Sequence, residues 1–206
     1  MSRGSTELSE SRKNEIIDAC AKLYQTMNYH DITLKEISRE TSFSRPSIYN
    51  YFQTKEEIFL GLLTREYHLW SLDLLALSKQ TDNLNKESFS DQFARILESR
   101  VVLLKITAMN LYEIEDYSRL ERLEEYKREF LYAMEMVKKC LQHFFPEMSE
   151  SQMENFRYAF FPFMYGIYPY VYPTAKQLEA MDAVGVPYHK TSVYEMVFQF
   201  INEFLH

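Results

Sequence analysis

Apolar residues recur at intervals of three and four along most of the chain, which is the spacing of one face of an α-helix. The clearest series ends before Pro146 and consists of Leu120, Leu123, Phe130, Met134, Val137, Leu141 and Phe144. The stretch from about Ser11 to Met27 has the same spacing, and the polar residues 1–10 before it are expected to be frayed. From Thr54 to Leu77 the pattern predicts one long helix, on the order of 35 Å at 1.5 Å per residue. The sequence therefore predicts an all-α fold.

Two short helices are predicted between the first helix and the long one. Thr33 and Glu36 have the spacing of a capping box, in which side chains bond the free backbone N–H groups of a helix start. Ser44 is a second N-cap, and its hydroxyl is expected to accept a hydrogen bond from the backbone N–H of Ser47. Pro46 suits the first turn, where a missing N–H costs little. Two short helices joined by a tight turn form a helix-turn-helix, whose second helix enters the major groove of DNA.

The second short helix has only one thin apolar face. Ile48 and Phe52 are four residues apart and can be buried together, which leaves basic and aromatic side chains outside. A further capping box, from Thr54 to Glu57, starts the long helix directly afterwards. A helix with so little to bury is best explained by contact with a partner, and its exposed face suits DNA.

From about Arg12 to Leu63 the residues resemble the TetR family of transcriptional regulators. The matching positions are Tyr29, Thr33, Ile37-Ser38, Ser44, Ile48-Tyr49, Tyr51-Phe52 and Lys55-Glu56-Glu57-Ile58. Asn28 and Ser42 stand where the family usually has glycine, and asparagine tolerates the left-handed backbone at a helix end. The resemblance implies a three-helix helix-turn-helix head, joined by a long helix to a larger helical effector and dimerisation domain. We accordingly place the DNA-binding domain at residues 1–54 and the larger domain at residues 55–206.

The predicted DNA contacts lie on and beside the second short helix. They are Thr33, Lys35, Arg45, Pro46, Ser47, Tyr49, Asn50, Tyr51 and Lys55. Arg45 is the candidate for reading guanine in the major groove, and Ser47 can contact base or phosphate. Thr33 and Lys55 lie at helix starts, where backbone N–H groups also meet phosphate, so they are expected to position the protein. The resemblance assigns the two tyrosines to contacts with the DNA backbone.

The charge is unevenly distributed, which reconciles a net charge of −7 with a DNA-binding role. Residues 1–55 carry a net charge of +1 and the remaining residues −8, so the acidic body need not meet phosphate. An apolar content of 46% and only four glycines favour helices over hairpins. Cys20 and Cys140 lie on apolar helical faces, and we expect both to be buried and reduced, as in the cytoplasm, where we place the protein.

The stretch Tyr158–Ala175 contains no charged residue in 18 positions, which is long enough to span a membrane. Its three prolines and five tyrosines argue against insertion, because broken backbone and unpaired hydroxyls are costly in lipid. We expect a buried, kinked helix here and no membrane partner. Residues 107–117 are expected to form one further helical stretch.

The larger domain has two candidate binding surfaces. By the resemblance, an effector cavity would be lined by Met109, Tyr112, Met134, Met164, Tyr165 and Tyr168. Such residues at helical spacing belong to the core more often than to a pocket. The last helix, from about Thr191, has a broad apolar face that would otherwise be an exposed patch, so with the helix around Phe156–Ile167 it is the predicted dimer interface. Its interface residues are Tyr194, Val197, Phe198, Ile201 and Phe204.

The sequence has no pattern typical of an enzyme, a metal site or a cofactor site. The five histidines lack metal-ligand spacing, and neither a Ser-His-Asp set nor a Gly-rich phosphate loop is recognisable. We therefore predict a homodimeric regulator that binds operator DNA, responds to a small-molecule effector and, as is usual in the family, represses. The alternative is a non-enzymatic adaptor that uses the same fold to bind a protein partner, with DNA contact secondary.

Overall fold

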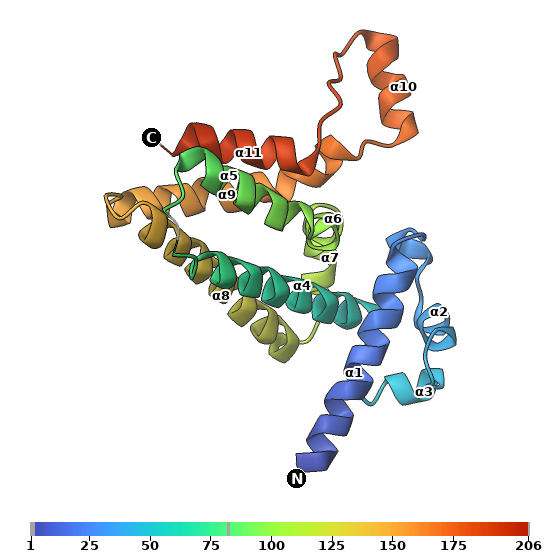
Figure 1. Cartoon of the computed structure of the whole chain (residues 1–206). Coiled ribbons are helices and arrows are strands. Elements are labelled where there is room, and N and C mark those ends of the chain that lie inside the picture. Colours follow the sequence, from blue (N-terminus) through green and yellow to red (C-terminus); the bar gives the residue numbers. More distant parts are fainter. Residues whose placement is uncertain (1–2, 82, 206) are drawn as a thin grey trace. The chain divides into compact units, whose positions relative to one another are not determined.

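The computed structural model describes residues 3–81 and 83–205, and every element in these ranges is a helix (Figure 1). The chain forms two compact units. The first unit contains the residues up to Glu66 together with Asn110–Glu129, and the second unit contains the other residues. The predicted all-α fold is confirmed.

The first unit is built from the N-terminal helices and the first parts of two long ones. Its elements are α1 (Arg3–Tyr24), the 3-10 helix η1 (Tyr29–Asp31), α2 (Leu34–Arg39), α3 (Arg45–Ile48), the start of α4 (Lys55–Leu77), α7 (Leu111–Asp116) and the start of α8 (Leu120–Phe144). Helix α2 contacts both α1 and α3, as Figure 1 shows. Ile58, Leu62 and Leu63 at the start of α4 are fully buried, so this unit extends beyond residue 54.

Helix α1 starts earlier than the apolar spacing indicates. It begins at Arg3, so the expectation of a frayed segment over residues 1–10 is wrong from that residue onward. The Lys13 ammonium pairs with the Glu10 carboxylate one turn earlier, at 2.7 Å, and such pairs stabilise an exposed helix. A polar sequence therefore continues the helix here without having an apolar face to bury.

The turns before and after α2 contain no residue in the left-handed backbone conformation. Helix α1 ends at Tyr24, not Met27, so Asn28 lies beyond it in extended backbone with φ −71° and ψ 151°. The left-handed conformation expected at Asn28 is therefore wrong. The backbone N–H of Ser42 donates to the Glu15 carboxylate at 2.6 Å, and this contact from α1 holds the turn where the family usually has glycine.

Isoleucines and aromatic rings form the core of the first unit. Its fully buried side chains include Ile16, Cys20, Ile32, Ile37, Ile48, Ile58 and Phe59. The ring of Phe59 meets the rings of Tyr24 and Tyr29 edge-on, with centres 5.0 Å and 4.8 Å away. This core joins α1, η1 and the start of α4 into the platform that supports α3.

The second unit contains the remainder of α4 and α8 and five further helices. These are α5 (Lys86–Glu98), α6 (Val101–Met109), α9 (Glu150–Val171), α10 (Ala175–Val184) and α11 (Val193–Phe204). Helix α11 packs along α5, and α6 packs against α9. Helix α10 stands apart from these helices in Figure 1, and none of its residues is buried. The single helix expected over residues 107–117 is wrong, because the backbone breaks at Asn110 (φ −140°, ψ 0°) between α6 and α7.

Aromatic rings fill the core of the second unit. Trp70 is fully buried, and its ring contacts those of Phe93, Phe160 and Phe161. Most of the uncharged stretch lies in α9, which includes two prolines within the helix. Among the described residues, no helix combines the length and the apolar character needed to cross a membrane. Both cysteines are buried and free, as expected.

Candidate nucleic-acid interface

Side chains close in sequence hold the starts of α2 and α3. Thr33 caps α2, since its hydroxyl accepts a hydrogen bond from the backbone N–H of Glu36 at 3.4 Å. Ser44 has the extended backbone of an N-cap, but its hydroxyl bonds to the Ser47 hydroxyl at 2.9 Å and makes no side-chain cap. The Ser47 N–H donates to the Ser44 carbonyl instead, also at 2.9 Å. The predicted cap position is right, and the predicted cap bond is wrong.

Helix α3 has one buried side and one exposed side. Ile48 and Phe52 are buried in the core of the first unit, as predicted. The exposed side chains are Arg45, Pro46, Tyr49 and Asn50, while Ser47 and Tyr51 are half-buried. Helix α3 itself ends at Ile48, and the chain continues in a turn, in which the Phe52 N–H donates to the Ile48 carbonyl at 3.0 Å. Four exposed side chains, on a short, anchored helix and in the turn directly after it, form a surface available to a partner.

Two arginines lie beside the tyrosines of this surface. The Nη2 atom of Arg45 donates to the hydroxyl of Tyr49 at 3.3 Å. Arg12 of α1 donates through Nη1 to the hydroxyl of Tyr51 at 3.2 Å, and its guanidinium lies 5.8 Å from the centre of the Phe43 ring. Local spacing does not predict a role for Arg12, because it lies on a different helix, 39 residues before its partner.

The side chain of Lys55 is directed toward the core of the first unit. Its Nζ atom donates to the carbonyl oxygen of Tyr29 at 3.0 Å and lies 4.1 Å from the centre of that ring. A cation over an aromatic face is attracted by the ring electrons, so these contacts hold the start of α4 to η1. Thr33 and Lys35, by contrast, are exposed at the start of α2.

A buried carboxylate lies where the turn after α3 meets α4. Glu57 is 1% exposed, and its carboxylate accepts a hydrogen bond from the backbone N–H of Gln53 at 2.7 Å. Arg119, just before α8, donates to both carboxylate oxygens, from Nε at 2.5 Å and from Nη2 at 2.9 Å. Burial by itself would raise the pKa of Glu57, but the hydrogen bonds from Arg119 and Gln53 outweigh it and hold the pKa below its usual value. Thr54 caps α4 through the Glu57 N–H at 3.1 Å, so only half of the predicted capping box forms.

A second arginine, on α8, reaches the same turn. Arg122 donates from Nη2 to the carbonyl oxygen of Tyr51 at 3.0 Å, and its guanidinium lies 5.5 Å from the centre of the Phe52 ring. The Thr54 hydroxyl donates to the carbonyl oxygen of Tyr117 at 3.2 Å. These partners are 63 and 71 residues apart in sequence, so local spacing gave no signal for them.

The six side chains predicted to line an effector cavity do not form one group. Tyr112 is 86% exposed and Met109 is 55% exposed, because both flank the break at Asn110 where α6 ends. Met164 is fully buried in the core. The half-buried members are Met134, Tyr165 and Tyr168. None of the six lines either of the two grooves of the second unit described below.

The predicted dimer residues divide between core and surface. Val197 and Ile201 are fully buried because α11 packs along α5, so they stabilise the subunit and their assignment to an interface is wrong. Tyr194 and Phe198 are half-buried, with stacked rings 5.8 Å apart, and the Tyr194 hydroxyl donates to Asp91 at 2.7 Å. Phe204 is also half-buried and lines a groove.

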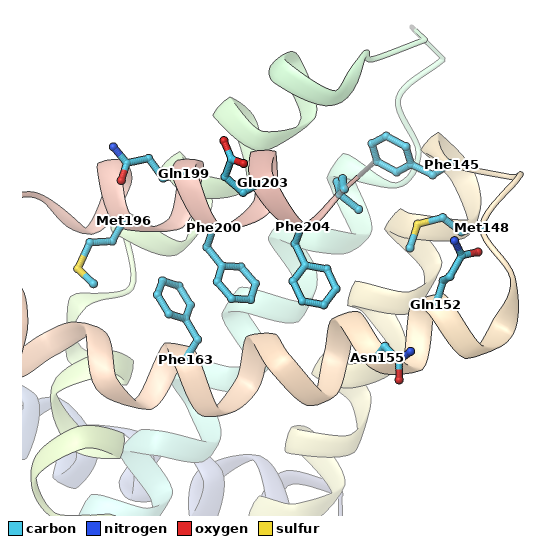
Figure 2. Close-up of a pocket in the computed structure, with 11 residues that line it drawn as sticks. Phe145, Met148, Gln152, Asn155, Phe163, Met196, Gln199, Phe200, Glu203 and Phe204 are labelled. Atoms are coloured by element: carbon cyan, nitrogen blue, oxygen red, sulfur yellow. The ribbon is translucent and has the colours of Figure 1, made fainter.

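This groove, of about 650 Å³, lies between α9 and α11 (Figure 2). Its apolar side chains include Phe163, Met196, Phe200 and Phe204, and its polar ones are Gln152, Asn155, Gln199 and Glu203. The rings of Phe163 and Phe200 stack with centres 4.3 Å apart, and Figure 2 shows Phe200 and Phe204 pointing from α11 toward α9. A second groove, of about 810 Å³, lies between α10 and the ends of α9 and α11 and shares Met196 and Gln199 with the first.

The capped α2, the tight turn and the anchored, exposed α3 define a helix-turn-helix protein. The family described as bacterial regulatory proteins, tetR family, matches residues 16–62, and the family described as tetracyclin repressor-like, C-terminal domain, matches residues 64–206. The chain therefore belongs to the TetR family of transcriptional regulators.

Two curated relatives are regulators of the same type. The chain is 33% identical over 90 residues to the uncharacterized HTH-type transcriptional regulator YdgC of Bacillus subtilis (strain 168). It is 40% identical over 57 residues to the HTH-type transcriptional regulator HbdR of Aromatoleum sp. (strain CIB). The alignments span 44% and 27% of this chain and 45% and 25% of those proteins, which is less than half of either relative.

Solved structures share the fold over nearly the whole chain. The fatty acid degradation regulator FadR from Bacillus halodurans has a TM-score of 0.61 at 16% identity, covering 94% of each chain. A TetR-family transcriptional regulator from Mesorhizobium loti has a TM-score of 0.58 at 15% identity, covering 100% of this chain and 98% of that one. FadR from Bacillus subtilis in complex with stearoyl-CoA has a TM-score of 0.58 at 14% identity, covering 93% and 98%.

Proposed function

We propose that this protein is a homodimeric, non-enzymatic repressor that binds operator DNA through α3 and is released by a small-molecule effector. The observation that carries the proposal is the exposed side of α3, where Arg45, Tyr49 and Asn50 are available to a partner. Arginine pairs in two-pronged fashion with O6 and N7 of guanine in the major groove, so Arg45 is the base-reading residue. Burial of Ile48 and Phe52 supplies the fixed support that such reading requires.

Contacts to phosphate are assigned to the groups around α3. Arg12 bonds the Tyr51 hydroxyl, and Lys35 is exposed on α2, which packs on α3. Both bring positive charge near α3, and phosphate contacts position a protein without reading sequence. Tyr49 and Tyr51 offer hydroxyls for the same purpose. Lys55 is assigned to holding α4 against η1, because its ammonium already bonds the Tyr29 carbonyl.

The proposal is tested by selecting binding sites for the wild-type protein from a library of random duplex DNA. Arg45→Ala is expected to weaken binding to the selected operator by about 1–3 kcal/mol and to relax the preference at one base pair. Arg128→Ala is the matched control, because Arg128 is an exposed arginine of α8 that pairs with Glu124 on the same helix at 3.7 Å. Equal losses on operator and random DNA would refute base reading by Arg45. Failure of the wild type to enrich any sequence would refute the DNA-binding function and favour the adaptor alternative.

We propose the groove between α9 and α11 as the dimer surface, with a second copy of the chain as its occupant. Its lining combines aromatic rings and methionines with amides and one carboxylate, which is the composition of a protein–protein interface. In a two-fold dimer both copies present the same surface, so two helices from each copy would form a four-helix contact. Such a dimer has to hold its two α3 helices about 34–36 Å apart, or a multiple of that distance, to enter successive major grooves.

Met196→Glu tests this surface, because Met196 lines both grooves and is half-buried in the subunit. The variant is expected to sediment as a monomer and to lose operator binding while it keeps the helical circular-dichroism spectrum of the wild type. Leu131→Glu on α8 is the control, since Leu131 is exposed and lies in neither groove. A wild-type protein that is monomeric at micromolar concentration contradicts the dimer.

We propose that the effector binds within the second unit. The match of residues 64–206 to the family's C-terminal domain supports this location. Stearoyl-CoA, bound in one of the solved structures with the same fold, is a reasonable first compound for a melting-shift screen, together with free fatty acids and cationic dyes. A compound that raises the melting temperature and lowers operator affinity supports the proposal.

A further inference from the structure

The segment that follows the recognition helix is held by side chains from a distant part of the sequence. Arg119 binds both carboxylate oxygens of Glu57, which also accepts the backbone N–H of Gln53. Arg122 donates to the carbonyl oxygen of Tyr51 and covers the ring of Phe52. The two arginines are 62 and 71 residues later in the chain than these partners, and all of these residues belong to the first unit.

These contacts act on the backbone that sets the angle between α3 and α4. Helix α3 ends at Ile48, and the carbonyl of Tyr51 in the turn after it is a backbone acceptor that Arg122 satisfies. The Glu57 carboxylate joins Gln53, in that turn, to the guanidinium of Arg119. The turn is therefore fixed at two points, and both depend on arginines outside the helix-turn-helix.

We propose that Arg119 and Arg122 are positioning residues for DNA binding, which orient α3 against α4 and make no contact with DNA themselves. Groups that read a partner have to be held within about 0.5 Å of the productive geometry by the residues behind them. Loss of either arginine loosens the turn and misplaces Arg45 relative to its base pair. The inference rests on the proposed DNA-binding function and adds residues that this function did not include.

The test compares Arg119→Met and Arg122→Met with the control Arg128→Met, whose arginine is 66% exposed on α8, the helix that contains Arg122. Methionine keeps the length of the side-chain stem and removes the guanidinium. Affinity for the selected operator and for random duplex DNA is measured over a series of salt concentrations. We expect each of the two variants to bind the operator about tenfold more weakly or worse. Their affinity for random DNA and the salt dependence of operator binding stay at the wild-type values, and Arg128→Met behaves as the wild type.

A further variant separates positioning from general instability. Arg119→Met leaves the Glu57 carboxylate buried without its cation, so the double variant Glu57→Gln with Arg119→Met removes that charge as well. It is expected to fold and still to bind the operator about tenfold more weakly. Because both arginines act on one turn, combining Arg122→Met with this double variant is expected to give less than the product of the separate losses.

Three outcomes overturn the inference. A salt slope reduced by about one identifies the arginine as a direct phosphate contact. Equal losses on operator and random DNA identify a general loss of folded protein. Wild-type operator affinity in both Arg122→Met and the double variant shows that the turn does not depend on these arginines. In all three the proposed DNA-binding function stands, whereas a wild-type protein that selects no sequence removes that function and this inference with it.

Discussion

The neighbouring carboxylates Glu56 and Glu57 illustrate how burial separates residues that look alike in the sequence. Glu56 accepts a hydrogen bond from the Tyr29 hydroxyl at 3.2 Å and remains partly exposed. Glu57 is buried, and donors from Gln53 and Arg119 surround it. A buried carboxylate stays charged only where donors replace water, so the structural role of Glu57 depends on its protonation.

Lowering the pH is therefore expected to remove the contribution of Glu57 to stability. Its pKa is lowered in the folded protein, so below its unfolded value of about 4.3 the unfolded chain takes up a proton that the folded chain does not. The contribution is complete above that pH and is lost as the pH falls through the folded pKa. The free energy of unfolding of the wild type, minus that of Glu57→Gln, should shrink from pH 5 to pH 3. Urea unfolding of both proteins at several pH values measures this difference.

The comparison between the two proteins cancels the other carboxylates. The pKa values of Asp91 and Glu150 are also lowered, by hydrogen bonds from Arg95 and Lys138 respectively, and both groups are present in the wild type and the variant. A difference in unfolding free energy that stays constant over this pH range would mean that Glu57 titrates alike in the folded and unfolded chains.

Local spacing predicts contacts within one turn of a helix and fails for contacts between distant segments. The Thr33 cap and the buried pair Ile48 and Phe52 follow from positions three or four apart, and the structure confirms them. The pair of Glu57 and Arg119 depends on how α7 and the start of α8 fold back on the head, and a single sequence carries no periodic signal for that. Local spacing therefore predicts the exposed residues of the candidate site. It does not predict the distant arginine that holds the turn behind them.

Among the helices, α11 shows that an apolar face does not reveal whether it packs within the subunit or against a second copy. The spacing predicts a broad apolar face, and its centre, Val197 and Ile201, packs within the subunit on α5. The flank of the face, with Phe200 and Phe204, borders the groove with α9. The pattern contains no information on which neighbour covers which part of the face, so the sequence alone predicts a dimer interface for all of it.

Ile201→Ala is expected to destabilise the subunit. Removing a fully buried branched side chain leaves a cavity, which costs about 2–5 kcal/mol. Asn202→Ala on the same helix is the control, and it should change the free energy of unfolding by less than about 0.5 kcal/mol. Urea unfolding of both variants at the same protein concentration compares the two. A cost below 1 kcal/mol for Ile201→Ala would contradict the packing of α11 on α5.

For the molecule as a whole, the charge pattern and the two compact units divide the chain at different residues. Residues 1–55 carry the positive excess, whereas the first compact unit also takes in the start of α4 and residues 110–129. Helices α4 and α8 each contribute residues to both units. A boundary drawn at residue 54 separates the helix-turn-helix by charge. The hydrogen bonds from Arg122 to the Tyr51 carbonyl and from the Gln53 N–H to Glu57 cross that boundary.

If an effector releases the operator, thermodynamic linkage requires the operator to weaken effector binding by the same factor. The coupling is expected to be about 5–150-fold, because an effector shifts an equilibrium only by its different affinity for the two states. The measurement is a pair of effector titrations, one with saturating operator and one without DNA. Arg45→Ala is the matched control, since this variant is bound by DNA to a smaller extent at the same concentration and its effector affinity should therefore fall less than that of the wild type. If a compound releases the wild-type protein from DNA yet binds equally well with and without operator, it competes by some route other than a coupled change between two states.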